Sequence, residues 1–288
     1  MSTKAIRLTL FLFIVGGAIS LAFSSYASIF ASAFGLLLAL LSLLWIYSLY
    51  LKDSSIIDWF WGPGFAISAW YYFIQVGNSN STRNLILCLL VSIWALRLGI
   101  YIYKRNHGKG EDYRYQAWRA AAGKHYWWVS FFRVFLLQGL LMCLIGSVLY
   151  IAQASGKSSL QFFDYIGILL WLVGLYFEAV GDWQLQQFKQ QNPSSSAVLN
   201  TGLWRYTRHP NYFGDALIWW GYFMFALATP YGWLYIFAPA FMTFLLLKVS
   251  GVALLEQAMD TKKEKYRLYR QQTSAFIPWP PKKRANRL

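Results

Sequence analysis

Residues 28–51 read SIFASAFGLLLALLSLLWIYSLYL and contain no charged side chain. A helix needs roughly 20 apolar residues to cross the hydrocarbon core of a bilayer, so this run predicts a membrane-spanning helix. Similar runs recur along the chain, at residues 6–23, 57–77, 84–104, 129–152, 161–185, 211–229 and 232–256. The chain is therefore predicted to be an all-α, polytopic integral membrane helix bundle with about seven to eight transmembrane helices.

The composition excludes a soluble globular surface. Hydrophobic residues make up 57% of the 288 residues, aromatic residues 20% and charged residues only 13%. A soluble domain of this length carries about 25% charged residues. The alternating pattern of a transmembrane barrel is absent, which leaves the helical class.

The distribution of basic residues predicts the orientation. If the N-terminus with Lys4 and Arg7 is cytoplasmic, only Arg83 and Lys157 remain on the outer side. That asymmetry fits the positive-inside rule with eight spans and both termini in the cytoplasm. The net charge of +15 flanks the spans and forms no soluble basic patch. Anionic membrane lipids and an anionic cofactor are therefore the expected partners, and nucleic acid is not.

The densest group of polar side chains lies in the stretch 199–216, LNTGLWRYTRHPNYFGDA, which opens an apolar helix. Pro210 lacks an N–H and fits the first turn of that helix, which predicts that the free N–H groups of Asn211, Tyr212 and Phe213 point back at the loop. A helix N-terminus beside two arginines favours an anion, although a basic loop that only sets topology is the alternative. The predicted site includes Arg205, Arg208, His209, Asn211, Tyr212 and Asp215.

Polar residues in the other spans lie mainly at the ends predicted to be cytoplasmic. They are Asp58, Arg97, Arg133, Gln138, Glu178, Asp182, Asp215, Lys248 and Glu256. Ionisable groups inside a membrane are costly, so their concentration predicts a protein-lined or wet cavity that opens to the cytoplasm. A single residue of this kind can instead extend its charge to the interface. Glu178 and Asp182 are four residues apart and share one helix face, where they can accept hydrogen bonds.

Two further segments belong to the same layer. Residues 104–119, KRNHGKGEDYRYQAWR, combine turn-forming glycines with arginines such as Arg114 that can clamp a phosphate. A basic amphipathic segment on the membrane surface would look similar. The C-terminal tail carries Tyr266 and Tyr269 before several prolines and is expected to fold back beneath the bundle as a cover. A solvated tail that only contacts lipid is the alternative.

Five segments of the chain match the motifs of a known family. They are DWFWGPGF (58–65), GKGEDYRY (108–115), LLQGLL (136–141), TGLWRYTRHPNYFGD (201–215) and TSAFIPWPP (273–281). In these segments the chain resembles uncharacterised bacterial membrane proteins that are grouped with the steroid 5α-reductases. The resemblance implies N-terminal membrane helices in 1–54 and a reductase-like membrane catalytic domain in 55–288. It also implies an NADPH site in the cytoplasmic half and hydride transfer to the C=C bond of a lipid-like enone.

Carried over by position, the resemblance implies cofactor roles for a set of polar residues. They are Arg97, Arg105, Asn106, Asp182, Asn211, Tyr212, Tyr266 and Tyr269. Glu178 stands where the reductases have an asparagine, and Asp215 stands where they have a glutamate. The reductases polarise the steroid ketone with a tyrosine and a glutamate. Trp94 stands at that tyrosine position, and Asp58 is the nearest candidate for the glutamate. Tryptophan cannot deliver a proton, so Asp58 is expected to act if desolvation keeps it protonated.

The sequence therefore predicts an NADPH-dependent oxidoreductase of the bacterial inner membrane, with its active site facing the cytoplasm and a lipidic substrate. The isoprenylcysteine carboxyl methyltransferases share the RHPxYxG core and use S-adenosylmethionine, so a membrane methyltransferase is the first alternative. A non-enzymatic lipid-binding or transport protein is the second. Nucleotide-binding loops and nucleophile motifs are absent, and three scattered histidines predict no metal site.

Overall fold

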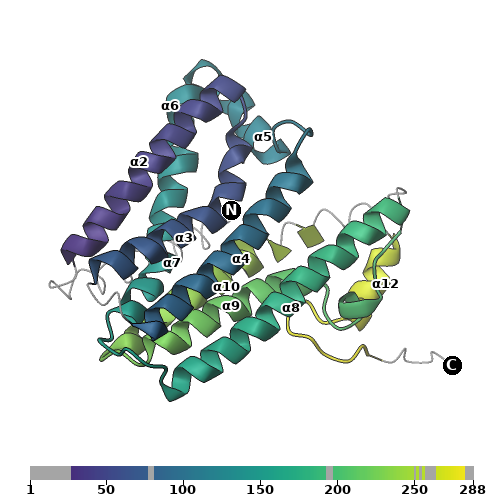
Figure 1. The fold of residues 1–288 in the computed structure, drawn as a ribbon. Helices are drawn as coiled ribbons and strands as arrows, with labels where there is room; N and C mark the ends of the chain where they lie inside the picture. The colour runs from purple at the N-terminus through teal and green to yellow at the C-terminus, as the bar shows by residue number, and fades with distance from the viewer. Residues whose placement is uncertain are drawn as a thin grey trace. The chain divides into compact units, whose positions relative to one another are not determined.

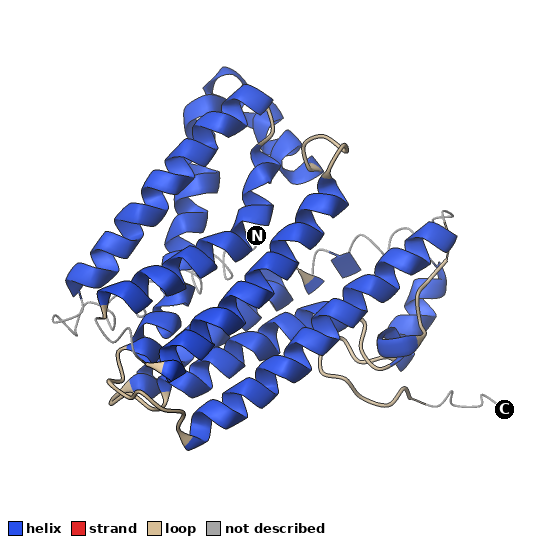
Figure 2. Cartoon of the chain, viewed as in Figure 1, coloured by secondary structure: helices blue, strands red, loops and turns tan. Residues whose placement is uncertain are grey.

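A computed structural model describes residues 27–76, 81–192, 197–249, 251–252, 255–256 and 264–282. Every regular element in these ranges is a helix (Figure 2), which confirms the predicted all-α class. The chain divides into two compact units. Unit 1 contains Phe162–Met224 and the residues from Pro239 onward, and unit 2 contains the described residues up to Gln161 together with Phe225–Ala238. The predicted domain boundary after residue 54 stays a prediction.

The helices are labelled in Figure 1. Those of unit 2 are α2 (Ala27–Leu51), η2 (Ser54–Ile56), α3 (Ile57–Gln75), α4 (Thr82–Asn106), α5 (Tyr113–Ala122), η3 (Gly123–His125), α6 (Tyr126–Ser130), the π-helical η4 (Phe131–Leu136), α7 (Leu137–Gln153) and η6 (Gly232–Ile236). The others, which lie wholly or mainly in unit 1, are α8 (Phe162–Gln191), η5 (Gly202–Arg205), α9 (Pro210–Ala226), α10 (Phe237–Phe244), the π-helical η7 (Leu245–Val249) and α12 (Glu264–Gln272).

Five helical segments of the described chain are long and apolar enough to cross a membrane. They are Ser28–Leu51, Thr82–Asn106, Tyr113–Gln153, Phe162–Gln191 and Gly232–Val249. These five confirm the predicted membrane-helix character. Spans were also predicted over α3 and α9, which form helices but are not among the five. One reason is that α9 has only 17 residues, slightly fewer than a crossing needs. The span predicted at 6–23 lies outside the described residues.

Glycines set the packing of α8 against α9 in unit 1. A Cβ atom added to Gly174 would lie 2.7 Å from the carbonyl oxygen of Gly214, and one added to Gly221 would lie 2.8 Å from that of Gly167. Both contacts are too short for a side chain, so the two backbones approach as closely as glycine allows. Gly181, one heptad after Gly174, continues this contact toward the start of α9. The close crossing brings the polar end of α8 to the first turn of α9.

Arg83 is fully buried in unit 2 and does not act as a solvated loop charge. Its guanidinium donates hydrogen bonds to the carbonyl oxygens of Ala152 and Phe225, each at 2.5 Å. These carbonyls lie in the last turns of α7 and α9, where a cation offsets the negative end of the helix dipole. Of the two basic residues assigned to the outer side, only Lys157 is therefore exposed.

Candidate functional site

The stretch 199–216 forms η5 and the first turns of α9. Pro210 is the first residue of α9, as its missing N–H predicts. The N–H of Phe213, in contrast, donates to the carbonyl oxygen of His209 at 3.0 Å. The prediction that this N–H is free is wrong, because His209 before the helix already supplies the first carbonyl acceptor.

Arg208 lies at the centre of this turn and is buried, with 7% of its side chain exposed. Its Nε donates to Oε1 of Glu256 at 2.7 Å, and its Nη1 donates to the carbonyl oxygens of Arg270 at 2.9 Å and Thr273 at 2.6 Å. The sequence predicts that Arg208 is available to an anionic ligand. In the structure its guanidinium instead joins three segments of unit 1, and its cofactor role stays a prediction.

Glu256 also contacts His209, a second residue of the predicted site. Nε2 of His209 lies 3.3 Å from the Glu256 oxygen that Arg208 contacts, and the His209 ring stacks on Tyr212 with 5.8 Å between centroids. Burial would raise the pKa of the Glu256 carboxyl, but the contacts with His209 and Arg208 outweigh burial and hold that pKa below its ordinary value. In the sequence, the one feature that points to Glu256 is its charge at the end of an apolar run.

Residues 273–282, which we call the strap, fold back onto the turn. The N–H of Arg208 donates to the carbonyl oxygen of Ser274 at 2.9 Å, and the N–H of Trp279 donates to that of Tyr206 at 2.9 Å. The hydroxyl of Thr207 donates to the carbonyl oxygen of Phe276 at 2.7 Å. The predicted folding back of the tail is confirmed for these residues. The turn is therefore held by backbone pairing as well as by Arg208.

Asp182 and Asn211 meet where α8 crosses the start of α9. Nδ2 of Asn211 donates to Oδ1 of Asp182 at 2.9 Å, and 4% of Asp182 is exposed. This bond fixes the orientation of the amide, since only the NH₂ side can face the carboxylate. The amide oxygen of Asn211 is buried and has no hydrogen-bond partner among the described residues. The pair therefore presents an acceptor that a ligand N–H could satisfy.

The remaining predicted residues of unit 1 lie around this crossing and the strap. Glu178 is buried on α8, and its Cβ lies 2.9 Å from the position that a Cβ on Gly214 would take. Arg205 is exposed at the end of η5. Tyr266 and Tyr269 lie on α12 with ring centroids 5.8 Å apart, and the hydroxyl of Tyr269 donates to the carbonyl oxygen of Trp204. Asp215, next to Gly214 on α9, is half-buried.

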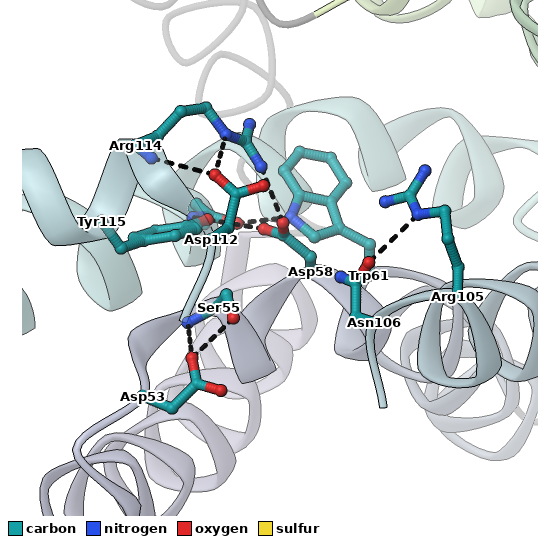
Figure 3. Close-up of polar contacts among 10 residues, drawn as sticks. Asp53, Ser55, Asp58, Trp61, Arg105, Asn106, Asp112, Arg114 and Tyr115 are labelled. Atoms are coloured by element: carbon teal, nitrogen blue, oxygen red, sulfur yellow. Dashed lines mark hydrogen bonds and ion pairs between the residues drawn. The ribbon is translucent and has the colours of Figure 1, made fainter. Parts of the chain in front are cut away.

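Unit 2 contains a second polar group, centred on Asp58 at the start of α3 (Figure 3). Oδ2 of Asp58 accepts a hydrogen bond from Nη2 of Arg114 at 2.9 Å, and Oδ1 accepts one from the hydroxyl of Tyr115 at 2.5 Å. Gln138 on α7 donates to that hydroxyl at 3.4 Å and accepts from the indole N–H of Trp61 at 2.5 Å. Three helices thus hold one carboxylate and one phenol in contact.

The arginines of 104–119 mostly pair with carboxylates of the same unit. Nε of Arg114 donates to Asp112 at 2.8 Å, and Arg119 donates twice to Glu111, at 2.9 and 2.8 Å. Burial would raise the pKa of Asp112 and of Glu111, but the hydrogen bonds from the two arginines hold both below their ordinary values. Glu111 also accepts a hydrogen bond from the N–H of Ser54 at 2.8 Å, which holds the segment onto η2. Phosphate binding by Arg114 stays a prediction.

The residues predicted on α4 divide into two environments. Arg97 and Arg105 each lie 5.8 Å from the ring of Tyr101, and Nε of Arg105 donates to Oδ1 of Asn106 at 3.1 Å (Figure 3). Trp94, in contrast, is 1% exposed and packs against Phe65 with 6.0 Å between ring centroids. The two arginines lie against the ring of Tyr101 and their cofactor role stays a prediction, whereas Trp94 is part of the apolar core of unit 2.

The fold and these polar groups together define an α-helical membrane protein. The chain belongs to the family described as "Protein of unknown function (DUF1295)", which matches residues 44–273. It is similar to the "Uncharacterized protein C594.04c" of the fission yeast Schizosaccharomyces pombe, with 28% identity over 276 residues that cover 85% of this chain and 78% of the relative. No solved structure matches the chain.

Proposed function

We propose that the protein is a membrane oxidoreductase that uses NADPH to reduce the C=C bond of a lipidic enone. The observation that carries this proposal is the Asp182–Asn211 pair at the start of α9, with its buried amide oxygen. The resemblance of the RHPNYFGD stretch to the steroid 5α-reductases supports it. The family match assigns no activity, so the reductase activity is our proposal.

The cofactor fits the unsatisfied acceptor of Asn211. A carboxamide NH₂ group, such as that of nicotinamide, would satisfy the amide oxygen that no described residue contacts. In unit 1, Asp182 fixes this amide, and the exposed guanidinium of Arg205 is available to a phosphate oxygen. The resemblance also implies cofactor roles for Arg97, Arg105 and Asn106 of unit 2. When bound, NADPH supplies the hydride for the reduction.

We assign the protonation step of the reaction to Asp58 and the residues that contact it. Hydride addition to an enone leaves negative charge on the carbonyl oxygen, which a positioned hydrogen-bond donor stabilises. A guanidinium and a phenol on its two oxygens favour the charged form of Asp58, but burial is the larger influence and disfavours it. The hydroxyl of Tyr115 has a single hydrogen and donates it to Asp58, so we assign the proton donor to Asp58 and a positioning role to Tyr115. Trp94 would add at most one N–H.

The proposed topology has eight spans, with both termini and the active site on the cytoplasmic side of a bacterial inner membrane. The asymmetry of basic residues supports this orientation, since Lys157 is exposed and Arg83 is internal. Reporter fusions at Lys157 and Tyr231, both exposed, are expected to report the outer side. A cytoplasmic signal from either fusion would contradict the orientation.

Thermal-shift titration of the purified protein tests the cofactor. Stabilisation follows the logarithm of ligand concentration over Kd and reaches about 2.7 kcal/mol at a hundredfold excess over Kd. We expect a response to NADPH that weakens as salt screens the charge pairs. A response to S-adenosylmethionine alone would replace the reductase with the methyltransferase. No response to either ligand would favour a lipid-binding or transport protein.

A further inference from the structure

The end of unit 2 that carries α5 and α6 is closed by direct side-chain contacts. The indole N–H of Trp45 on α2 donates to the carbonyl oxygen of Trp127 at 2.9 Å. The hydroxyl of Tyr126 donates to Ser54 at 2.9 Å. In Figure 1, α5 and α6 accordingly lie beside the end of α2. The last turns of α2 and the short helices α5 and α6 therefore form one continuous surface.

The acidic residues of this surface are already engaged. Basic residues outnumber acidic ones by eight to four in 52–58 and 104–133. Asp58 and Asp112 pair with Arg114, Glu111 pairs with Arg119, and Asp53 accepts from the N–H of Ser55 as a helix cap. The four carboxylates are thus occupied by two arginines and one backbone N–H.

Exposed lysines remain at this end. Lys52, Lys109 and Lys124 are exposed, and none of them forms an ion pair with a described residue. Lys52 follows α2, Lys109 lies in the loop after α4, and Lys124 lies between α5 and α6. Their ammonium groups therefore have no protein carboxylate to compensate them within the described chain.

Exposed aromatic rings lie among these lysines. The exposed fractions are 82% for Tyr50, 58% for Trp127 and 44% for Trp128. Tyrosine and tryptophan concentrate at the headgroup level of bilayers, where one part of the ring is apolar and another part is polar. Three candidate spans begin or end here, at Leu51, Asn106 and Tyr113. The lysines and rings therefore lie where membrane spans reach the bilayer surface.

We propose that Lys52, Lys109, Lys124, Tyr50, Trp127 and Trp128, here called the basic collar, bind the headgroups of anionic phospholipids. The lysines supply charge to the lipid phosphate, and the rings occupy the interface beside the acyl chains. Neutral phospholipids lack the net charge that uncompensated lysines favour. The collar is independent of the proposed reductase activity and does not require a bound cofactor.

Native mass spectrometry of the full chain in detergent, titrated with phosphatidylglycerol or with phosphatidylcholine, tests the collar. We expect tighter retention of phosphatidylglycerol by the parent. Replacing all three lysines (Lys52→Gln, Lys109→Gln and Lys124→Gln) is expected to weaken it by about fivefold per lysine, as attraction of about 1 kcal/mol per charge implies.

Two controls make the result specific. Lys157→Gln removes an exposed lysine beyond the far end of α7 and is expected to leave lipid retention unchanged. The three lysines replaced by arginine preserve the charge and are expected to bind like the parent. Equal retention of the two lipids by the parent would overturn the proposal. So would a glutamine variant that binds phosphatidylglycerol as tightly as the arginine variant does.

Discussion

Arg208 and Glu256 lie 48 residues apart in the sequence, and two nitrogens of the guanidinium are 2.7 Å from the same carboxylate oxygen. Both side chains are largely buried, at 7% and 14% exposure. The pair joins the turn before α9 to the segment that precedes α12, and the strap is bonded to the same arginine. Arg208, the arginine of the RHP motif, therefore holds together three segments of unit 1.

Arg208→Ala is expected to destabilise unit 1. Removing Arg208 leaves Glu256, among the described residues, with only His209 at 3.3 Å and Arg270 at 3.9 Å, and it takes a donor from two carbonyl oxygens, which costs about 3–5 kcal/mol. The measurement is the free energy of unfolding in detergent, together with protease cleavage within the strap. Arg205→Ala is the matched control, because Arg205 is exposed three residues earlier. Equal stability of the two variants would show that Arg208 does not hold the turn.

The Glu256 carboxyl makes stability depend on pH. Its pKa is lower in the folded state than its ordinary value of 4.5, so the unfolded chain binds more protons as the pH falls below that value. The contribution of the ion pair is therefore complete above pH 4.5 and is lost as the pH falls through the lower, folded-state pKa. Because Asp112 and Glu111 shift in the same direction, the quantity to measure is the difference between the parent and Glu256→Gln. A difference that did not shrink on acidification would contradict the assignment.

Because α8 and α9 cross closely, adding one methyl group at Gly174 is expected to lower the free energy of unfolding. Gly174→Ala would place a Cβ 2.7 Å from the carbonyl oxygen of Gly214, which forces the helices apart and costs about 1–3 kcal/mol. Gly35→Ala is the control, since no heavy atom lies within 4 Å of its added Cβ. Both changes gain similar helix propensity, so their difference in unfolding free energy isolates the contact. No difference would mean that the crossing is looser than described.

Pro210, the helix class and five spans were predictable because each depends on a local pattern. A proline lacks an N–H wherever it occurs, and an apolar run of bilayer length predicts a span without knowledge of its neighbours. The partners of Arg208 and Asp58 were not predictable in this way. Asp58 pairs with Arg114 across 56 residues and with Tyr115 across 57. The sequence offers several carboxylates and arginines, and only the packing of helices selects which of them meet.

The contact between Asp58 and Tyr115 follows from that packing and carries the chemical prediction. Asp58→Asn is expected to lower kcat by about 10²–10⁴-fold, the usual effect of removing a proton donor, while NADPH still raises the melting temperature. Tyr115→Phe removes only the hydrogen bond that positions Asp58 and is expected to lower kcat less, likewise sparing NADPH binding. Steady-state kinetics and thermal shift measured on the same samples separate the two effects. Full activity of Asp58→Asn would move the donor to another group.

The central claim is tested most directly by following the hydride itself. The purified protein is incubated with a lipidic enone and NADPH that carries deuterium on the transferred position of its nicotinamide ring, and the product is analysed by mass spectrometry. Hydride addition to the activated C=C bond predicts one deuterium at the β-carbon of the saturated ketone, with the second hydrogen coming from solvent. Failure to oxidise NADPH with any lipidic enone, or a saturated product without deuterium, would contradict the proposed reductase.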